Sequence, residues 1–290
     1  MPVSDVELIT LAASHDIINL GMLADEQRRR RHGTRTTFVR VAVVLAEPGG
    51  PLRCPAAAGE MRIEGTPSSR AAAIDRVREV TAAAGGVPVS GYSLADLEDL
   101  AAREAITLRA LLEELQQAGL ELVAEAPIDC LQSPRRAIEE VNIAGLTLAR
   151  LTVHRLPGPD VVPFLKSVAD LQRAVRVIRA FAPLPRTMNP AAPTTGYDDV
   201  KRIALARLVA DNVPSIQVDW SLYGPKLAQV ALTMGADDVD GVSAEDDMSE
   251  GRRRAPLEEI RRNILAAGQA PVERNGRFDI LRQIQDERSR

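Results

Sequence analysis

Residues 195 to 246 contain a helix, a strand, a second helix and a second strand in unbroken order, and this alternation restricts the possible folds more than any other feature. In the segment 198–209, apolar residues recur at helical spacing, and two aspartates stand in the first turn, where the helix dipole favours anions. The segment 215–221 alternates as a strand does, a second amphipathic helix ends at Gly235, and Val239 belongs to the next strand. We interpret this order as a parallel βαβ unit.

The same alternation extends along the chain. Segments with strand character cover residues 36–45, 60–64, 86–90, 120–124, 147–154, 180–184, 215–221 and 238–242, and most are followed by a helical segment. Such alternation implies a parallel sheet, and eight repeats imply a barrel of about 250 residues, which a chain of 290 accommodates. We therefore predict an α/β fold, a TIM-type (β/α)8 barrel that is either closed or partial.

The expected domain organisation follows from these segments. Residues 1–35 form an N-terminal helical segment, residues 36–246 the barrel, and residues 247–290 a C-terminal helical extension that ends in a short charged helix from Ile280. The first crossover helix is expected to be missing, because residues 46–59 contain three prolines and three glycines. Proline removes a backbone donor and clashes inside a helix.

Composition excludes several classes of protein. A net charge of −4 and an aromatic content of 3% argue against a nucleic-acid binder. There is no run of eighteen apolar residues and no charged-then-apolar leader, so we expect a cytoplasmic protein that does not bind membranes. Cys54 and Cys130 are far apart, so neither a disulfide nor a metal site is expected.

In a (β/α)8 barrel the functional groups stand at the carboxyl ends of the strands. His154 is the most specific candidate there, because the other two histidines, His15 and His32, fall on the N-terminal helices and imidazole titrates near neutral pH. We predict His154 and Arg155 as catalytic residues. Further polar groups expected at this rim for ligand binding are Glu125, Arg186, Asn189, Asp219, Ser221 and Tyr223. A solvated rim, or a histidine that only makes a structural hydrogen bond, explains the same residues.

The acidic cluster near the last strand has two interpretations. Asp237, Asp238, Asp240 and the residues 245–247 offer oxygen ligands for a cation. Their spacing does not match a calcium loop, so we predict a solvated acidic loop and no metal site.

One long stretch also resembles a known family. GPKLAQVALTMGADDVDG at 224–241, with TGYDDVKRIALARLVADNVPSIQVDW before it and APLEEIRRNILAAGQAPVERNGRF after it, resembles the C-terminal part of one radical-SAM group. That group contains aminofutalosine synthase, dehypoxanthine futalosine cyclase and the deazaflavin precursor (FO) synthase. The resemblance implies that Asp219, Trp220 and Lys226 belong to a substrate mouth. Packing alone also accounts for these motifs, since GPK starts a helix and GADD ends one.

The resemblance fails where the family binds its cofactor. Enzymes of this group hold a [4Fe–4S] cluster through three cysteines after the first strand and use it to reduce S-adenosylmethionine. Between Val41 and Gly65 this chain offers Cys54 alone. The family's glycine-rich segments are also altered at 63–67 and 124–129. We therefore expect no cluster and no other cofactor, with residual S-adenosylmethionine binding as the weaker alternative.

Two functional hypotheses follow. The first is a cluster-free relative that serves menaquinone biosynthesis by the futalosine pathway, or a neighbouring step, as a non-radical binding or partner subunit. Its expected partner is a cluster-bearing synthase of the same group, or a second copy of the chain, and its expected ligand is small and polar or aromatic. The second is an enzyme in which His154, Arg155 and the rim carboxylates perform acid–base chemistry on a nucleoside-like or aromatic substrate.

Overall fold

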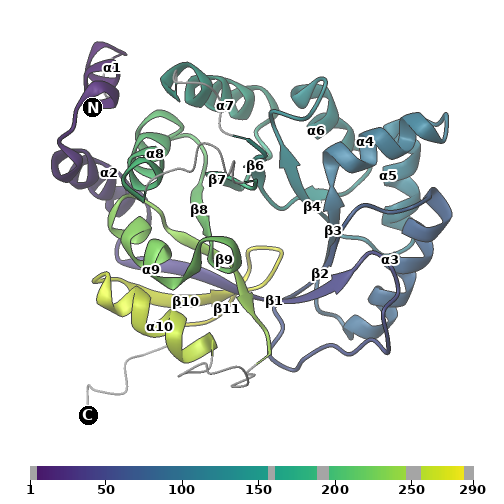
Figure 1. Cartoon of the computed structure of the whole chain (residues 1–290). Coiled ribbons are helices and arrows are strands. Elements are labelled where there is room, and N and C mark those ends of the chain that lie inside the picture. Colours follow the sequence, from purple (N-terminus) through teal and green to yellow (C-terminus); the bar gives the residue numbers. More distant parts are fainter. Residues whose placement is uncertain (1–4, 156–160, 188–195, 246–255, 284–290) are drawn as a thin grey trace.

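The computed structural model describes residues 5–155, 161–187, 196–245 and 256–283, and these form a closed barrel of parallel strands (Figure 1). Pairing of β9 with β1 closes the barrel, so the predicted TIM-type fold is confirmed and the barrel is not partial. The barrel strands are β1 (Arg35–Leu45), β2 (Glu60–Glu64), β3 (Val89–Ser93), β4 (Leu122–Pro127), the short pair β5 (Thr147–Leu148) and β6 (Leu151–Val153), β7 (Ala180–Pro185), β8 (Ser215–Asp219) and β9 (Asp238–Ser243).

Helices surround the barrel and bury its outer face (Figure 1). They are α3 (Arg70–Ala84), α4 (Leu94–Arg103), α5 (Leu108–Gln117), α6 (Pro134–Ile143), α7 (Val161–Val175), α8 (Gly196–Val209), α9 (Trp220–Thr233) and α10 (Pro256–Ala266). The side chains of Ser69 and Thr107 cap α3 and α5 by accepting the backbone N–H groups of Ala72 and Ala110. Leu97, Leu112 and Ile138 are fully buried between helices and strands. Each such side chain contributes about 1.5–3 kcal/mol relative to an exposed one.

The crossover between β1 and β2 contains no helix, as the prolines and glycines of residues 46–59 predicted. The segment returns to the barrel at Gly59, whose amide donates to the Arg40 carbonyl at 2.8 Å. A β-carbon at Gly59 would lie 2.9 Å from the Arg274 carbonyl oxygen, so glycine is required for this close approach. The barrel therefore closes although its first crossover has no helix.

The C-terminal segment crosses the amino-terminal end of the barrel. Strand β10 (Ala270–Arg274) pairs in parallel with the first half of β1, and the turn after it places Arg277 on Glu121, at 2.5 and 2.7 Å, beside the start of β4. The predicted charged helix at 280–290 is wrong for residues 280–283, because β11 (Ile280–Gln283) pairs antiparallel with β10, and residues 284–290 lie outside the described residues. Backbone hydrogen bonds to β10 thus override the helical character of this sequence.

The N-terminal helices α1 (Asp5–Ala13) and α2 (Ile17–His32) lie beside α8, as Figure 1 shows. Both helices were predicted. None of the described helices is both long and apolar enough to cross a bilayer.

Three aspartates around β9 are buried and paired, so the predicted solvated acidic loop is wrong for them. Asp237, Asp238 and Asp240 are at most 2% exposed. Their cationic partners are respectively Arg207, Arg274 and Arg62. A carboxylate removed from water needs such a partner, since an uncompensated buried charge costs several kcal/mol. Of residues 245–247, Glu245 is exposed and the other two lie outside the described residues.

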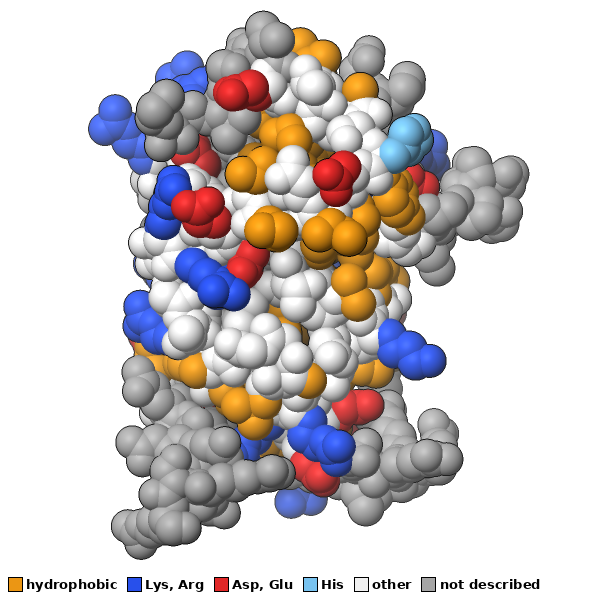
Figure 2. All heavy atoms as spheres, turned by 90° about the vertical axis from the view of Figure 1, so that its left-hand side faces the viewer, with side chains coloured by type: hydrophobic (Ala, Val, Ile, Leu, Met, Phe, Trp, Pro, Cys, Tyr) orange, Lys and Arg blue, Asp and Glu red, His pale blue; other side chains and the backbone are white. Residues whose placement is uncertain are grey.

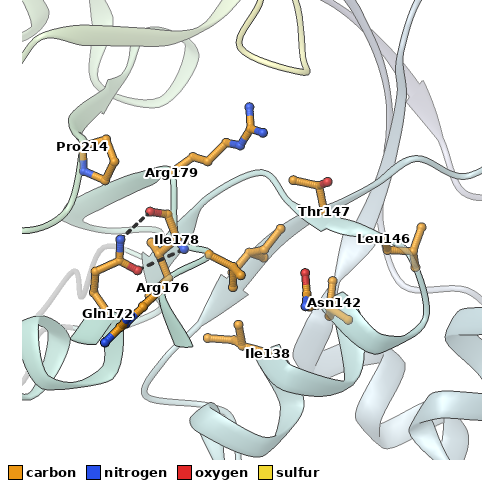
Figure 3. Close-up of a pocket in the computed structure, with 12 residues that line it drawn as sticks. Ile138, Asn142, Leu146, Thr147, Gln172, Arg176, Ile178, Arg179 and Pro214 are labelled. Carbon is orange, nitrogen blue, oxygen red and sulfur yellow. Dashed lines mark hydrogen bonds between the residues drawn. The ribbon is translucent and has the colours of Figure 1, made fainter. Parts of the chain in front are cut away.

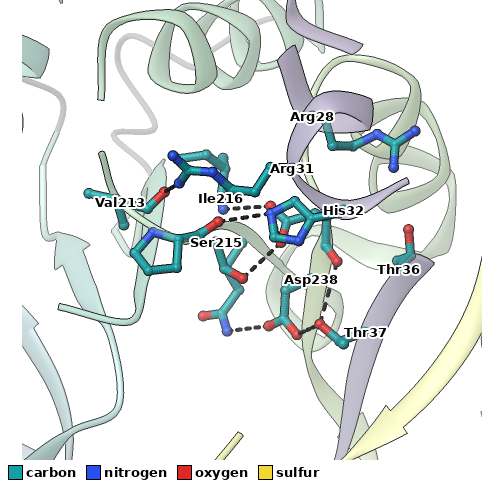
Figure 4. A network of polar contacts seen from close by, with 12 residues as sticks. Arg28, Arg31, His32, Thr36, Thr37, Val213, Ser215, Ile216 and Asp238 are labelled. Atoms are coloured by element: carbon teal, nitrogen blue, oxygen red, sulfur yellow. Dashed lines mark hydrogen bonds and ion pairs between the residues drawn. The ribbon is translucent and has the colours of Figure 1, made fainter. Parts of the chain in front are cut away.

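His32 joins this buried network at the end of α2 (Figure 4). Its Nε2 lies 2.9 Å from the Pro214 carbonyl oxygen and 3.4 Å from Asp237 Oδ2. Burial lowers the pKa of His32, and Arg207 acts in the same direction, whereas Asp237 raises it. The neutral imidazole is therefore the form that the fold favours.

This preference predicts a pH dependence of stability. Because the folded-state pKa of His32 is lowered, the unfolded chain takes up the proton first, so stability that is complete above about pH 6.5 is lost as the pH falls below it. In urea unfolding, the decrease between pH 7 and pH 5 should be smaller in His32→Gln than in the wild type. His15→Gln, at an exposed position, should behave like the wild type. Equal decreases in wild type and His32→Gln would contradict the prediction.

Candidate functional site

A recess of about 200 Å³ opens at the carboxyl ends of the barrel strands. It combines three arginines, three carboxylates and smaller groups from β2, β3, β4, α4, the segment between β5 and β6, and the residue that follows β7. Its lining consists of Arg62, Ile63, Glu64, Gly65, Tyr92, Ser93, Asp96, Ala124, Glu125, Arg150 and Arg186. Active sites of this fold occupy the same end of the barrel. This mouth recess is therefore the candidate site.

Arg186, at the end of β7, connects two carboxylates at the rim. Its Nε lies 3.0 Å from Glu125 Oε2, and its Nη1 donates to Asp219 Oδ2. Asp219 is buried at the end of β8 and also accepts the backbone N–H of Leu222 at 3.0 Å, which caps α9. Burial raises the pKa of Asp219, but the charges of Arg186 and Arg150 and the hydrogen bond from Ser221 together outweigh this effect and hold the pKa below its usual value. The rim thus contains an ionised and ordered charge cluster.

The floor of the recess is a second charge cluster. Asp240 accepts two hydrogen bonds from Arg62, at 2.8 and 2.9 Å, and a third from Arg150. Glu60 accepts from Arg62 Nε at 2.8 Å and from Ser90. All four charged side chains are at most 3% exposed. The Nε of Arg150 is buried without a hydrogen-bond partner among the described residues, so the floor offers one free donor.

The other walls supply a protonatable group and an apolar surface. Asp96 accepts from Thr66 Oγ1 at 3.1 Å, and burial, with the charge of Glu125 as a further cause, raises its pKa. Val43 and Leu45 are 54% and 65% exposed, although both belong to a barrel strand. They stand in register with Arg62 and Glu64 of the recess, on the neighbouring strand. The site therefore suits a ligand with both a polar and an apolar side.

The predicted catalytic pair stands beside the recess and does not line it. The backbone N–H groups of His154 and Arg155 donate to the carboxylate of Asp129 at 2.7 and 2.8 Å, which fixes the turn after β6. The His154 ring lies 3.3 Å from Thr187 Oγ1, and Arg155 is exposed. His154 thus stands at the rim with its ring beside the Thr187 hydroxyl, outside the lining of the recess.

The residues predicted around α9 separate into two groups. Ser221 donates to Asp219 at 2.7 Å, and Tyr223 donates to the Pro185 carbonyl, so both hold the rim in place. Trp220 is half-buried against the core. Lys226 is exposed beyond the kink at Gly224 and does not line the recess. Asn189 lies outside the described residues.

Sequence reasoning missed Arg62, Arg150 and Asp96. The two arginines stand in strand segments whose neighbours are apolar, MRI and LARLTV. Arginine is almost never buried without a partner, so this pattern signals a paired charge inside the barrel. Asp96 lies in the first turn of α4, where helix capping is a sufficient explanation for an acidic residue, so a place in the recess was not expected.

The residues after β1 do not fit a cluster held by three thiolates. Cys54 is the one cysteine there, and burial raises the pKa of its thiol, which favours the protonated form over the thiolate that binds metal. Cys130 is exposed and follows β4. In the described part of the chain, no group of three or more histidine, cysteine, aspartate or glutamate side chains is arranged to hold a metal ion.

Two solved structures superpose on this barrel over most of its length. Methylornithine synthase superposes with a TM-score of 0.66 at 14% identity, covering 93% of this chain and 94% of that one. HydG, the FeFe-hydrogenase maturase of Carboxydothermus hydrogenoformans, superposes with a TM-score of 0.62 at 11% identity, covering 93% and 76%. The fold is thus a TIM-type barrel.

Sequence comparisons then show which proteins this chain is similar to. Residues 183–287 match the family model of the CofH/MqnC C-terminal region. Aminodeoxyfutalosine synthase of Thermus thermophilus is 27% identical over 240 residues, which cover 72% of this chain and 64% of that protein. The Streptomyces coelicolor enzyme of the same name is 40% identical over 98 residues, covering 31% and 25%.

A transferase is related over a similar length. The 5-amino-6-(D-ribitylamino)uracil–L-tyrosine 4-hydroxyphenyl transferase of Methanococcus maripaludis is 23% identical over 240 residues, covering 72% of this chain and 67% of that protein. The chain spans about two thirds or less of these relatives. The predicted resemblance to this radical-SAM group is confirmed.

The buried ion pairs of Asp240 with Arg62 and Arg150 lead to a prediction about stability. Burial raises the pKa of Asp240, but Arg150 and Arg62 outweigh it and hold the pKa well below the usual value. Asp240→Asn leaves Arg150 without an anion and Arg62 with Glu60 alone, and should lower the free energy of unfolding by about 3–5 kcal/mol at pH 7. Because the folded-state pKa is lowered, this difference should shrink as the pH falls below about 4.

Urea unfolding followed by circular dichroism measures the effect. Glu26→Gln, which removes the exposed pair with Arg30, is the matched control and should change stability by no more than about 1 kcal/mol. An Asp240→Asn loss as small as that of the control would show that the floor cluster does not support the fold.

Proposed function

We propose that this chain is a cluster-free relative that serves menaquinone biosynthesis by the futalosine pathway, or a neighbouring step, as a non-radical binding or partner subunit. The observation that carries the proposal is a single protonated thiol, Cys54, in the segment where the group needs three thiolates, while the mouth of the barrel remains built and ordered. A protein that has lost the radical-generating residues but keeps its site retains the capacity to bind.

The mouth recess supports a small polar or aromatic ligand. Arg150 Nε offers a buried donor without a partner, which an acceptor atom of a ligand would satisfy. Val43 and Leu45 offer an apolar surface beside it. A planar ligand with hydrogen-bonding edges fits this combination, and the relatives' names include a nucleoside-like product and a uracil.

An apolar face supports the partner role. Figure 2 shows hydrophobic side chains gathered on the side of the molecule formed by the N-terminal helices and their neighbours. Ile18 and Met22 of α2 are 74% and 67% exposed. Val230 of α9 and Leu265 of α10 are also exposed, and α9 packs against both α2 and α10. Charged side chains of both signs surround them, as at the rim of a protein interface.

A second candidate function is acid–base catalysis on a nucleoside-like or aromatic substrate. Asp96 favours it, because a carboxyl with a raised pKa that lines the recess is a suitable proton donor. His154 stands outside the lining, which weighs against it as the central base. Turnover of a nucleoside by the isolated chain, lost in Asp96→Asn, would favour this function over binding alone.

Cluster reconstitution tests the first proposal directly. After anaerobic expression and incubation with iron and sulfide, we expect far less than stoichiometric iron and no cluster absorbance, because one thiol cannot replace three. A member of the group that carries the three cysteines, treated in parallel, is the control and should acquire its cluster. Stoichiometric iron with reductive cleavage of S-adenosylmethionine by this chain would refute the proposal.

Co-expression with a cluster-bearing synthase of the group tests the partner role. We expect a complex on size exclusion that Ile18→Glu with Met22→Glu weakens about tenfold or more, because burying two carboxylates in an apolar interface is costly. Ile143→Glu, at a residue 56% exposed on α6, is the control and should leave the complex intact. A complex that the double variant does not weaken, or a homodimer alone, would contradict this interface or this partner.

A further inference from the structure

A second cavity, of about 300 Å³, lies at the opposite end of the barrel from the mouth recess. Figure 3 shows the residues that line it. It opens between α6 and α7, beside the starts of β5 and β7. Its size is at the lower end of ligand pockets, which span about 300–1,000 Å³. Residues at this end of a TIM barrel ordinarily serve stability, so an open cavity here requires its own explanation.

Apolar side chains form much of the floor of the cavity, and Asn142 and Thr147 add polar groups to its wall. Ile138 and Val141 of α6, with Leu146, Leu148 and Ile178, line it, and each is at most 3% exposed. These side chains are fixed by the core behind them. The floor therefore suits an apolar group, and shape fixed in advance lowers the entropy cost of binding.

The rim carries two arginines, Arg176 and Arg179. Arg176 follows the last residue of α7 and has a φ of 57°, in the left-handed region where glycine is the usual residue. Gln172 holds this turn, because its amide donates to the Ile178 carbonyl at 3.0 Å and accepts the Ile178 N–H at 3.1 Å (Figure 3). A strained conformation that a buried side chain maintains is a pointer to function.

Neither arginine has a carboxylate partner among the described residues. Arg176 makes one weak contact, from its Nε to the Arg173 carbonyl at 3.4 Å. Arg179 donates to the Arg277 carbonyl at 2.7 Å and leaves further donors of its guanidinium at the rim. Most other arginines near the barrel are paired with aspartate or glutamate. Two cations without an anion, above an apolar floor, match an anionic ligand with an apolar body.

We propose that this cavity is a second binding site, for a small carboxylate with an apolar body. The carboxylate lies at the rim. Arg176 and Arg179, exposed side chains that extend to different sides of the cavity in Figure 3, turn toward it and donate charge-assisted hydrogen bonds. The apolar body lies on Ile138, Leu146 and Ile178. An arginine after a helix also stabilises the helix dipole, but that role needs neither a cavity nor a residue in the left-handed region.

Benzoate is the probe, and uncharged benzamide of the same shape is its control. Ligand-observed NMR titrations at constant ionic strength should show saturable benzoate binding to the wild type, about tenfold or more tighter than benzamide. Arg176→Gly should weaken benzoate about tenfold or more while its melting temperature stays equal or rises, because glycine relieves the positive φ. Arg179→Ala, which leaves the backbone unchanged, should also weaken it.

Two further variants locate the site. Arg136→Ala, at an exposed residue of α6 outside the cavity lining, should bind benzoate like the wild type. Arg186→Ala, at the mouth recess, should also retain it. Equal binding of benzoate and benzamide, wild-type affinity in Arg176→Gly and Arg179→Ala, or loss in Arg186→Ala alone would overturn the proposal. None of these outcomes depends on iron content or on the partner complex, so the two proposals fail separately.

Discussion

The ion pairing of Asp240 with Arg62 and Arg150 connects strands from three parts of the barrel wall. The interior of many TIM barrels is filled with branched apolar side chains. Here, by contrast, charged residues of β2, β9 and the segment between β5 and β6 fill the centre, and each carboxylate is fixed by a guanidinium. Because buried charges must be matched, the cluster specifies which strands face one another and at what height. The recess above depends on it, since its floor is made of the same residues.

The pairing of β1 with three other strands explains how the barrel closes without its first crossover helix. Strand β1 is fixed on one edge by β9 and on the other by β2 and β10, so its position does not depend on a helix packed behind it. The fold therefore tolerates the proline-rich segment at 46–59 and the single cysteine in it. A segment after β1 with one cysteine and no helix is therefore compatible with a closed barrel.

The sequence predicted the repeating part of the fold well. Alternating strands and helices and the helix-free crossover follow from hydrophobic periodicity and from the placement of prolines, which act over a few residues. The strand β11 could not be predicted, because its conformation is set by β10 and by no local pattern. The aspartates of the GADDVDG stretch suggested a solvated loop for a similar reason. Only the fold shows that Arg207, Arg274 and Arg62, distant in sequence, reach them.

The candidate site was predicted in part. Glu125, Arg186 and Asp219 meet at the mouth because strand ends converge there in any such barrel. Which rim residues turn inward was not predictable, since His154 and Lys226 follow turns whose direction depends on contacts such as Asp129 and the Gly224 kink.

The pairing of β1 with both β9 and β10 has a kinetic consequence. Thr37 of β1 lies beside Asp238 of β9, so the barrel cannot shut until segments 201 residues apart in the sequence have met. The entropy of bringing such distant segments together is lost before their contacts form, which slows folding of proteins rich in long-range pairs. During that interval both edges of β1 and the unmatched arginines of the interior face water, and an open array of strands is the species most exposed to misassembly.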